Sequence, residues 1–171
     1  MPTPARAPAH RTPLYTPEQR RRRDASAWTL VQGLLAPLQF LVFAASLVLV
    51  MRYLATGTGY DIATASVVLK TLLLYTIMVT GCIWEKVVFG VYLFAEPFFW
   101  EDVFSMLVLA LHTAYLLALF GGWLGPRALM LLALAAYAAY VINATQFVLK
   151  LRAARLAARD ADATERQGVP A

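Results

Sequence analysis

The sequence predicts an all-α, polytopic integral membrane protein with four transmembrane helices and both termini in the cytoplasm. Of its 171 residues, 60% are hydrophobic and only 15% are charged, whereas a soluble domain is about half apolar and about a quarter charged. Four apolar stretches lie at about residues 28–54, 62–84, 103–120 and 128–149. Each is long enough to cross a bilayer, which takes roughly 17–25 residues.

The first 25 residues are polar, rich in proline and basic, and are expected to form a cytoplasmic tail. Within them, Thr16-Pro17-Glu18-Gln19 is typical of a helix start, with Thr16 as the cap, Pro17 at the first position and Gln19 three residues after the cap. The run Arg20 to Arg23 is interpreted as a topology signal that contacts anionic lipid. Nucleic-acid binding is not expected, because the aromatic and groove-fitting residues that would accompany it are absent.

Basic residues predict the orientation of the membrane domain, residues 26–151. Four spans place both termini on one side, and both termini are strongly basic, while each of the two opposite loops has at most one positive charge close to the turn. The positive-inside rule therefore puts the termini, including a C-terminal tail at 152–171, in the cytoplasm. The same rule puts residues 85–102, between the second and third spans, on the cytoplasmic side.

The second span contains two charged positions that cannot both lie comfortably in water. Lys70 and Glu85 are 15 residues apart, or ~22 Å along a helix, inside a hydrocarbon core that is ~30 Å thick. Lys70 is expected to extend its long side chain outward to water. Glu85 has a shorter reach, and burial disfavours the charged form of a carboxyl group. Glu85 is therefore a candidate proton donor, although an exposed ion pair with Lys86 is the alternative.

The stretch from residue 84 to residue 102 is the main candidate for a functional site. It contains four of the ten carboxylates and a dense run of aromatic residues that includes Trp100. Glu101 and Asp102 begin the third span, where they could act in catalysis or simply stabilise the helix dipole. The aromatic run could be an interfacial belt or a wall around a flat hydrophobic ligand. The candidate catalytic residues are Glu85, Glu101 and Asp102.

The spans also contain polar residues that are expected to face the interior of the bundle. In the third span, one helix face combines Glu101, Ser105, Val108, His112 and Tyr115. His112 could be a core histidine hydrogen-bonded to a neighbouring span, or an axial ligand to the metal of a tetrapyrrole. The candidate binding residues are Lys86, His112, Trp100, Asn143, Gln146 and Gln32. The single cysteine, Cys82, is too few for a metal site, and no cofactor or metal site of the protein is expected.

Long runs of this sequence resemble one enzyme family. They are Pro13 to Ser26, Trp28 to Phe43, Ile83 to Tyr115, and Tyr140-Val141-Ile142-Asn143-Ala144-Thr145-Gln146-Phe147. Together they are similar to the 3-vinyl bacteriochlorophyllide hydratases, also called 2-vinyl bacteriochlorophyllide hydratases, over about residues 13–156. The resemblance implies a hydro-lyase that adds water to the ring-A vinyl group of a chlorophyllide, giving a 1-hydroxyethyl group, in bacteriochlorophyll biosynthesis. It implies the reaction and not the catalytic residues. It also implies a location in the bacterial inner membrane, either the cytoplasmic or the intracytoplasmic photosynthetic membrane.

The expected partners are a chlorophyllide-type tetrapyrrole, membrane lipid and other pigment-biosynthesis enzymes. The tetrapyrrole carries its own magnesium. Hydration of a conjugated vinyl group needs a protonated acid and a group that orients or deprotonates water, which suits a pair of carboxyls. Glu101 is favoured over Asp102 as the partner of Glu85, because it shares a helix face with Ser105 and His112. The alternative function is that of a non-catalytic, antenna-like pigment-binding protein with His112 as the axial ligand.

Overall fold

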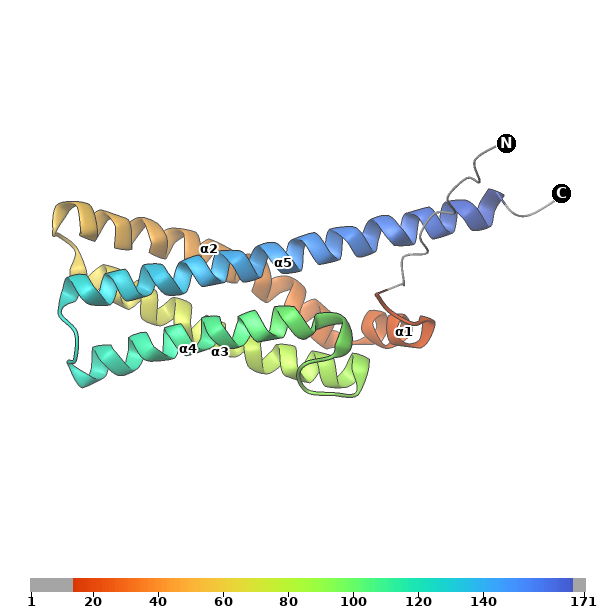
Figure 1. The fold of residues 1–171 in the computed structure, drawn as a ribbon, viewed down its shortest axis with the longest axis horizontal. Helices are drawn as coiled ribbons and strands as arrows, with labels where there is room; N and C mark the ends of the chain where they lie inside the picture. Colours follow the sequence, from red (N-terminus) through yellow and green to blue (C-terminus); the bar gives the residue numbers. More distant parts are fainter. Residues whose placement is uncertain (1–13, 168–171) are drawn as a thin grey trace, which may run out of the picture.

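The computed structural model describes residues 14–167, and its described part is entirely helical apart from loops and turns. The elements are α1 (Pro17–Ala25), α2 (Ala27–Thr56), α3 (Tyr60–Phe89), the 3₁₀ helix η1 (Glu96–Phe98), α4 (Phe99–Gly121) and α5 (Pro126–Gln167). Figure 1 shows them as a bundle with α1 at one end. Residues 1–13 and 168–171 of the two expected tails lie outside the described residues.

Four of these segments are long and apolar enough to cross a membrane, which confirms the predicted four-span, all-α fold. They are Ala27–Thr56, Tyr60–Phe89, Glu96–Gly121 and Pro126–Ala157. Glycines in the left-handed conformation end three of the helices: Gly57 (φ 72°) follows α2, Gly90 (φ 86°) follows α3 and Gly122 (φ 65°) follows α4. This conformation disfavours other residues and lets the chain turn sharply.

The spans alternate in direction, and α2 packs mainly against α3 while α4 packs mainly against α5. Two short loops, residues 57–59 and 122–125, join the helices at one end of the bundle. At the other end lie α1, the start of α2, the connection between α3 and α4, and the C-terminal part of α5 (Figure 1). The segment richest in carboxylates thus shares one end of the molecule with the Arg20–Arg23 run.

Small residues allow the helices to approach closely in the centre of the bundle. Ala63 of α3 and Ala133 and Ala136 of α5 are completely buried, as are Val67 of α3 and Met130 of α5. Helices in a membrane associate through such close van der Waals packing rather than through a hydrophobic driving force. Larger apolar side chains of the same helices are exposed on the outside, where lipid would cover them.

The predicted helix start at Thr16 is confirmed. The Thr16 hydroxyl accepts a hydrogen bond from the Gln19 N–H (3.2 Å), and the Gln19 side chain accepts one from the Thr16 N–H (2.9 Å), which is a complete capping box. Just before it, Tyr15 is buried and stacks on Phe89 at 5.8 Å between ring centroids. Burial raises the pKa of the Tyr15 phenol above its usual value. Tyr15 therefore stays neutral and anchors α1 to the end of α3.

Lys70 does not extend toward water, and the expectation that it would do so is wrong. Its side chain is completely buried, and its Nζ lies 3.8 Å from the centroid of the Tyr140 ring. The reason is its register: Lys70 follows the buried residues Ala63 and Val67 at helical spacing and therefore points into the bundle. The face of Tyr140 attracts the ammonium group there.

Candidate active site

Two carboxyl groups meet at the end of the bundle where α3 ends and α4 begins. Glu85 lies in the last turns of α3 and is 6% exposed, and Asp102 lies in the first turn of α4 and is 4% exposed. The two carboxyl groups are within hydrogen-bonding reach of each other. Two adjacent carboxyls repel each other when both are charged, so such a pair favours the state that shares one proton.

The loop between the helices holds this pair with consecutive backbone amides. The Phe94 N–H donates to Asp102 Oδ2 at 2.8 Å, and the Ala95 N–H donates to Glu85 Oε2 at 3.3 Å. Phe94 has a φ of 60°, a left-handed conformation that is uncommon for residues other than glycine. Backbone strain of this kind persists only where surrounding contacts impose it. Here the strained residue is one of the two whose amides bind the carboxyl pair.

Glu101 has a different partner. Lys150 of α5 forms an ion pair with Glu101 Oε2 and donates a second hydrogen bond to the Pro97 carbonyl. The Lys150 ammonium also lies 5.2 Å from the centroid of the Phe98 ring. Lys150 thus ties α5 to η1 and to the start of α4. Its role could not be read from the sequence, where it is one of several basic residues beyond the last span.

The remaining polar candidates divide between this end and the helix interfaces. Asn143 Nδ2 donates to Ser105 Oγ at 2.8 Å, while the buried oxygens Asn143 Oδ1 and Gln146 Oε1 have no protein partner. Both residues belong to the part of α5 that precedes Lys150. Gln32, in contrast, donates to Thr80 Oγ1 at 2.7 Å and so joins α2 to α3.

Exposed residues lie close to the carboxyl pair in the chain. Lys86 is exposed and donates to the Gly90 carbonyl at 2.8 Å, which caps α3. Three aromatic rings form a continuous exposed group, the aromatic platform, with centroid separations of 5.7 Å between Phe94 and Phe99 and 5.5 Å between Phe99 and Trp100. Trp100 is 67% exposed. Because the Phe94 amide bonds Asp102, this platform is directly connected to the carboxyl pair.

His112 lies far from these groups, in the middle of α4. It is completely buried, and its Nδ1 is 2.8 Å from the Val108 carbonyl. Ten residues separate it from Asp102, or ~15 Å along the helix. The predicted inward face of α4 is confirmed, since Glu101, Ser105, Val108, His112 and Tyr115 are all buried. In the described residues, no three His, Cys, Asp or Glu side chains come together as a metal site would require.

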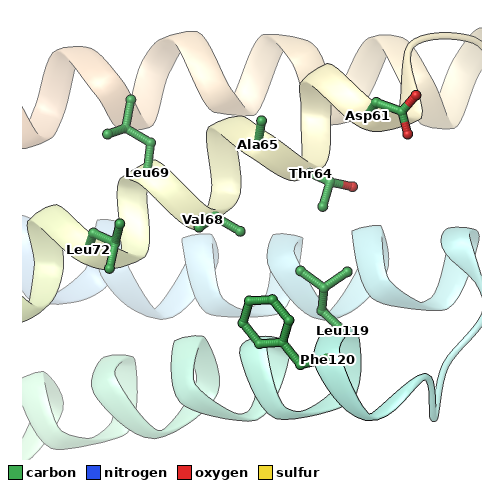
Figure 2. Close-up of a pocket in the computed structure, with 8 residues that line it drawn as sticks. All are labelled: Asp61, Thr64, Ala65, Val68, Leu69, Leu72, Leu119 and Phe120. Atoms are coloured by element: carbon green, nitrogen blue, oxygen red, sulfur yellow. The ribbon is translucent and has the colours of Figure 1, made fainter.

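A surface groove of about 470 Å³ lies at the opposite end of the bundle. Figure 2 shows its lining between α3 and α4, from Asp61 to Leu72 and at Leu119 and Phe120. Asp61 and Glu85 are 24 residues apart on α3, or ~36 Å. The groove is mostly apolar and faces outward, so it is unrelated to the carboxyl pair.

The comparisons with known proteins agree on one family. A family model described as 2-vinyl bacteriochlorophyllide hydratase matches residues 15–153. The protein of that name from Cereibacter sphaeroides is 70% identical over 157 residues, covering 91% of this chain and 96% of the relative. The one from Rhodobacter capsulatus is 66% identical over 163 residues, covering 95% of this chain and 94% of the relative. No solved structure matches the chain. This chain therefore belongs to the 2-vinyl bacteriochlorophyllide hydratase family.

Proposed function

We propose that Glu85 and Asp102 are the proton-transferring pair of this membrane hydratase, which adds water to the ring-A vinyl group of a chlorophyllide-type tetrapyrrole in bacteriochlorophyll synthesis. The observation that carries the proposal is the contact between these two buried carboxyls, held by the adjacent amides of Phe94 and Ala95. The product is the 1-hydroxyethyl derivative, so the reaction is that of a carbon–oxygen hydro-lyase.

The reaction needs one proton donor and one proton acceptor close together. A proton is added to the terminal carbon of the vinyl group, which leaves a cation on the carbon attached to the ring. The conjugated macrocycle spreads this charge. The oxygen of water then bonds to that carbon while the water loses a proton. An acid and a base positioned within hydrogen-bond reach of the reacting atoms accelerate such steps by about 10²–10⁴-fold each.

The surroundings of the two carboxyls favour Glu85 as the acid and Asp102 as the base. Asp102 lies in the first turn of α4, where the helix dipole stabilises a negative charge. It also accepts the shorter amide hydrogen bond, 2.8 Å against 3.3 Å for Glu85. The shared proton therefore belongs mainly to Glu85. Glu101 is the weaker candidate for the base, because its charge is already matched by Lys150.

The proton balance closes within the pair. Glu85 gives its proton to the vinyl carbon, and Asp102 takes a proton from the attacking water. The pair then still holds one proton, now on Asp102. Transfer across the contact between the two carboxyls returns this proton to Glu85 and readies the site for the next substrate.

The aromatic platform formed by Phe94, Phe99 and Trp100 is the proposed contact for the flat face of the macrocycle. Aromatic rings favour offset stacking on other π-systems, and the platform adjoins the carboxyl pair through Phe94. The exposed Lys86 ammonium is the proposed partner for the propionate of the substrate. The unpartnered oxygens of Asn143 and Gln146 are proposed acceptors for hydrogen bonds from water or substrate. Gln32 is bonded to Thr80 and fits a role in helix packing better.

We propose further that both termini and the carboxyl pair lie on the cytoplasmic side of a bacterial inner membrane. The basic runs at Arg20–Arg23 and from Lys150 to Arg159 support this orientation through the positive-inside rule. In this orientation the pair lies near the cytoplasmic surface of the membrane, where an amphipathic pigment could approach it from the cytoplasm or from the bilayer.

The test is turnover of a 3-vinyl chlorophyllide by membranes that contain the protein, followed through the blue shift of the long-wavelength band as conjugation is lost. Glu85→Gln and Asp102→Asn should each lower turnover by about 10²–10⁴-fold, because each removes an acid–base group while keeping its shape. Glu96→Gln is the matched control, since Glu96 is an exposed carboxyl of the same connecting segment. Near-normal turnover in both variants would show that the pair is not catalytic. Pigment binding without any spectral conversion by the unaltered protein would favour the antenna-like alternative.

A further inference from the structure

Three polar side chains that the proposed chemistry does not use are buried in the spans of the bundle. Lys70 of α3 and His112 of α4 are completely buried, and Gln39 of α2 is 3% exposed. Four of their polar atoms are buried without a hydrogen-bond partner in the protein: Lys70 Nζ, His112 Nε2, Gln39 Oε1 and Gln39 Nε2. Buried polar groups without hydrogen bonds cost free energy, and in native proteins they usually have a protein or water partner.

Two of these side chains lie against one group of aromatic rings, and the third lies one helical turn from a member of that group. Lys70 Nζ lies 3.8 Å from the centroid of Tyr140, and the His112 ring lies 5.9 Å from that of Tyr137. Phe43 joins the two tyrosines, at 4.9 Å from Tyr140 and 5.3 Å from Tyr137. Gln39 precedes Phe43 by one helical turn and shares its inward face. Lys70 and His112 are close enough for the charge of one to act on the other.

The hydrogen-bonding inventory of these atoms identifies the kind of ligand. His112 Nδ1 faces the Val108 carbonyl, which can only accept, so Nδ1 carries the hydrogen and Nε2 is an acceptor. Gln39 offers two donors and one acceptor, and Lys70 offers only donors. An anion would face the His112 lone pair and the Gln39 oxygen, and a metal cation would face the ammonium group. Water both donates and accepts, and therefore satisfies the whole set.

We propose that Lys70, His112 and Gln39 form a water-binding site in the middle of the membrane domain. The site lies among spans whose outer faces are apolar, and it is independent of the carboxyl pair. Bound water supplies the partners that the protein does not, and allows three polar residues to remain in the core of the bundle.

The experiment is water-edited solid-state NMR of the full-length protein in lipid bilayers, with labelled histidine and valine. Magnetisation should pass from water to the His112 ring as quickly as to Val91, which is exposed in the loop after α3. Val50, which is completely buried in the apolar core, serves as the dry reference. Transfer to His112 that is as slow as transfer to Val50 would overturn the proposal.

Two variants make the test specific. Lys70→Met and Gln39→Leu keep the size of the side chains and remove the polar atoms, so together they should abolish rapid transfer to His112. Thr71→Val is the matched control: Thr71 is buried beside Lys70, but its hydroxyl is already bonded to the Val67 carbonyl at 2.8 Å. Rapid transfer should persist in Thr71→Val. If transfer also persists in the Lys70→Met, Gln39→Leu double variant, with helical content unchanged, the water is held elsewhere and the proposed site is wrong.

Discussion

Lys150 provides the sharpest test of how the end of the bundle is held together. In Lys150→Met, the Glu101 carboxylate, with a side chain only 8% exposed, loses its cation. Removing one partner of a buried ion pair destabilises a protein by ~3–5 kcal/mol, because the remaining charge stays buried. The Lys150 side chain is 26% exposed, so water reaches part of the site. We therefore expect a loss near the lower end of that range, about 3 kcal/mol.

The reasoning also predicts a rescue. Combining Lys150→Met with Glu101→Gln removes both charges, so the loss should fall to about 1 kcal/mol, the worth of ordinary hydrogen bonds. Lys86→Met is the control, because Lys86 is exposed and its interactions should contribute at most ~1 kcal/mol. The measurement is the free energy of unfolding of the purified protein in detergent micelles, titrated with denaturant. A double variant as unstable as Lys150→Met alone would show that the unpaired buried Glu101 charge is not the cause of the loss.

Three further predictions concern the carboxyl pair, the orientation and His112. Turnover should fall on both sides of an optimum pH. At low pH both Glu85 and Asp102 are protonated and no base is left, while at high pH both are ionised and no acid is left. In Asp102→Asn, the residual activity should no longer fall at low pH. A reporter fused at residue 171 should lie in the cytoplasm, and one fused at Gly57 should lie on the opposite side of the membrane. Finding both reporters on the same side would contradict the orientation. His112→Leu should lose far less than the 10²–10⁴-fold typical of acid–base groups, because His112 lies ~15 Å from Asp102 along α4. A loss of that size in turnover assays, with the protein still folded, would contradict a site confined to the end of the bundle.

Much of the fold follows from local sequence patterns. The four spans can be predicted by comparing the length of each apolar run with the thickness of a bilayer. This comparison requires no knowledge of tertiary contacts. The inward face of α4 follows from helical periodicity, and the capping box at Thr16 follows from residues three positions apart. The same periodicity, applied to Ala63, Val67 and Lys70, would have placed Lys70 inside the bundle. The length of its side chain suggested the wrong direction.

The partners of the acidic residues depend on the tertiary structure. The sequence marked Glu85, Glu101 and Asp102 as an acidic group, and helical periodicity favoured Glu101 as the partner of Glu85. In the folded protein, Lys150 reaches Glu101 from a position 49 residues further along the chain, and Asp102 is the carboxyl that meets Glu85. The left-handed conformation of Phe94 directs consecutive amides onto this pair. These partners depend on how α3, α4 and α5 pack together. Helical periodicity predicts which residues of one helix are neighbours, but contacts between residues of different helices depend on the tertiary fold.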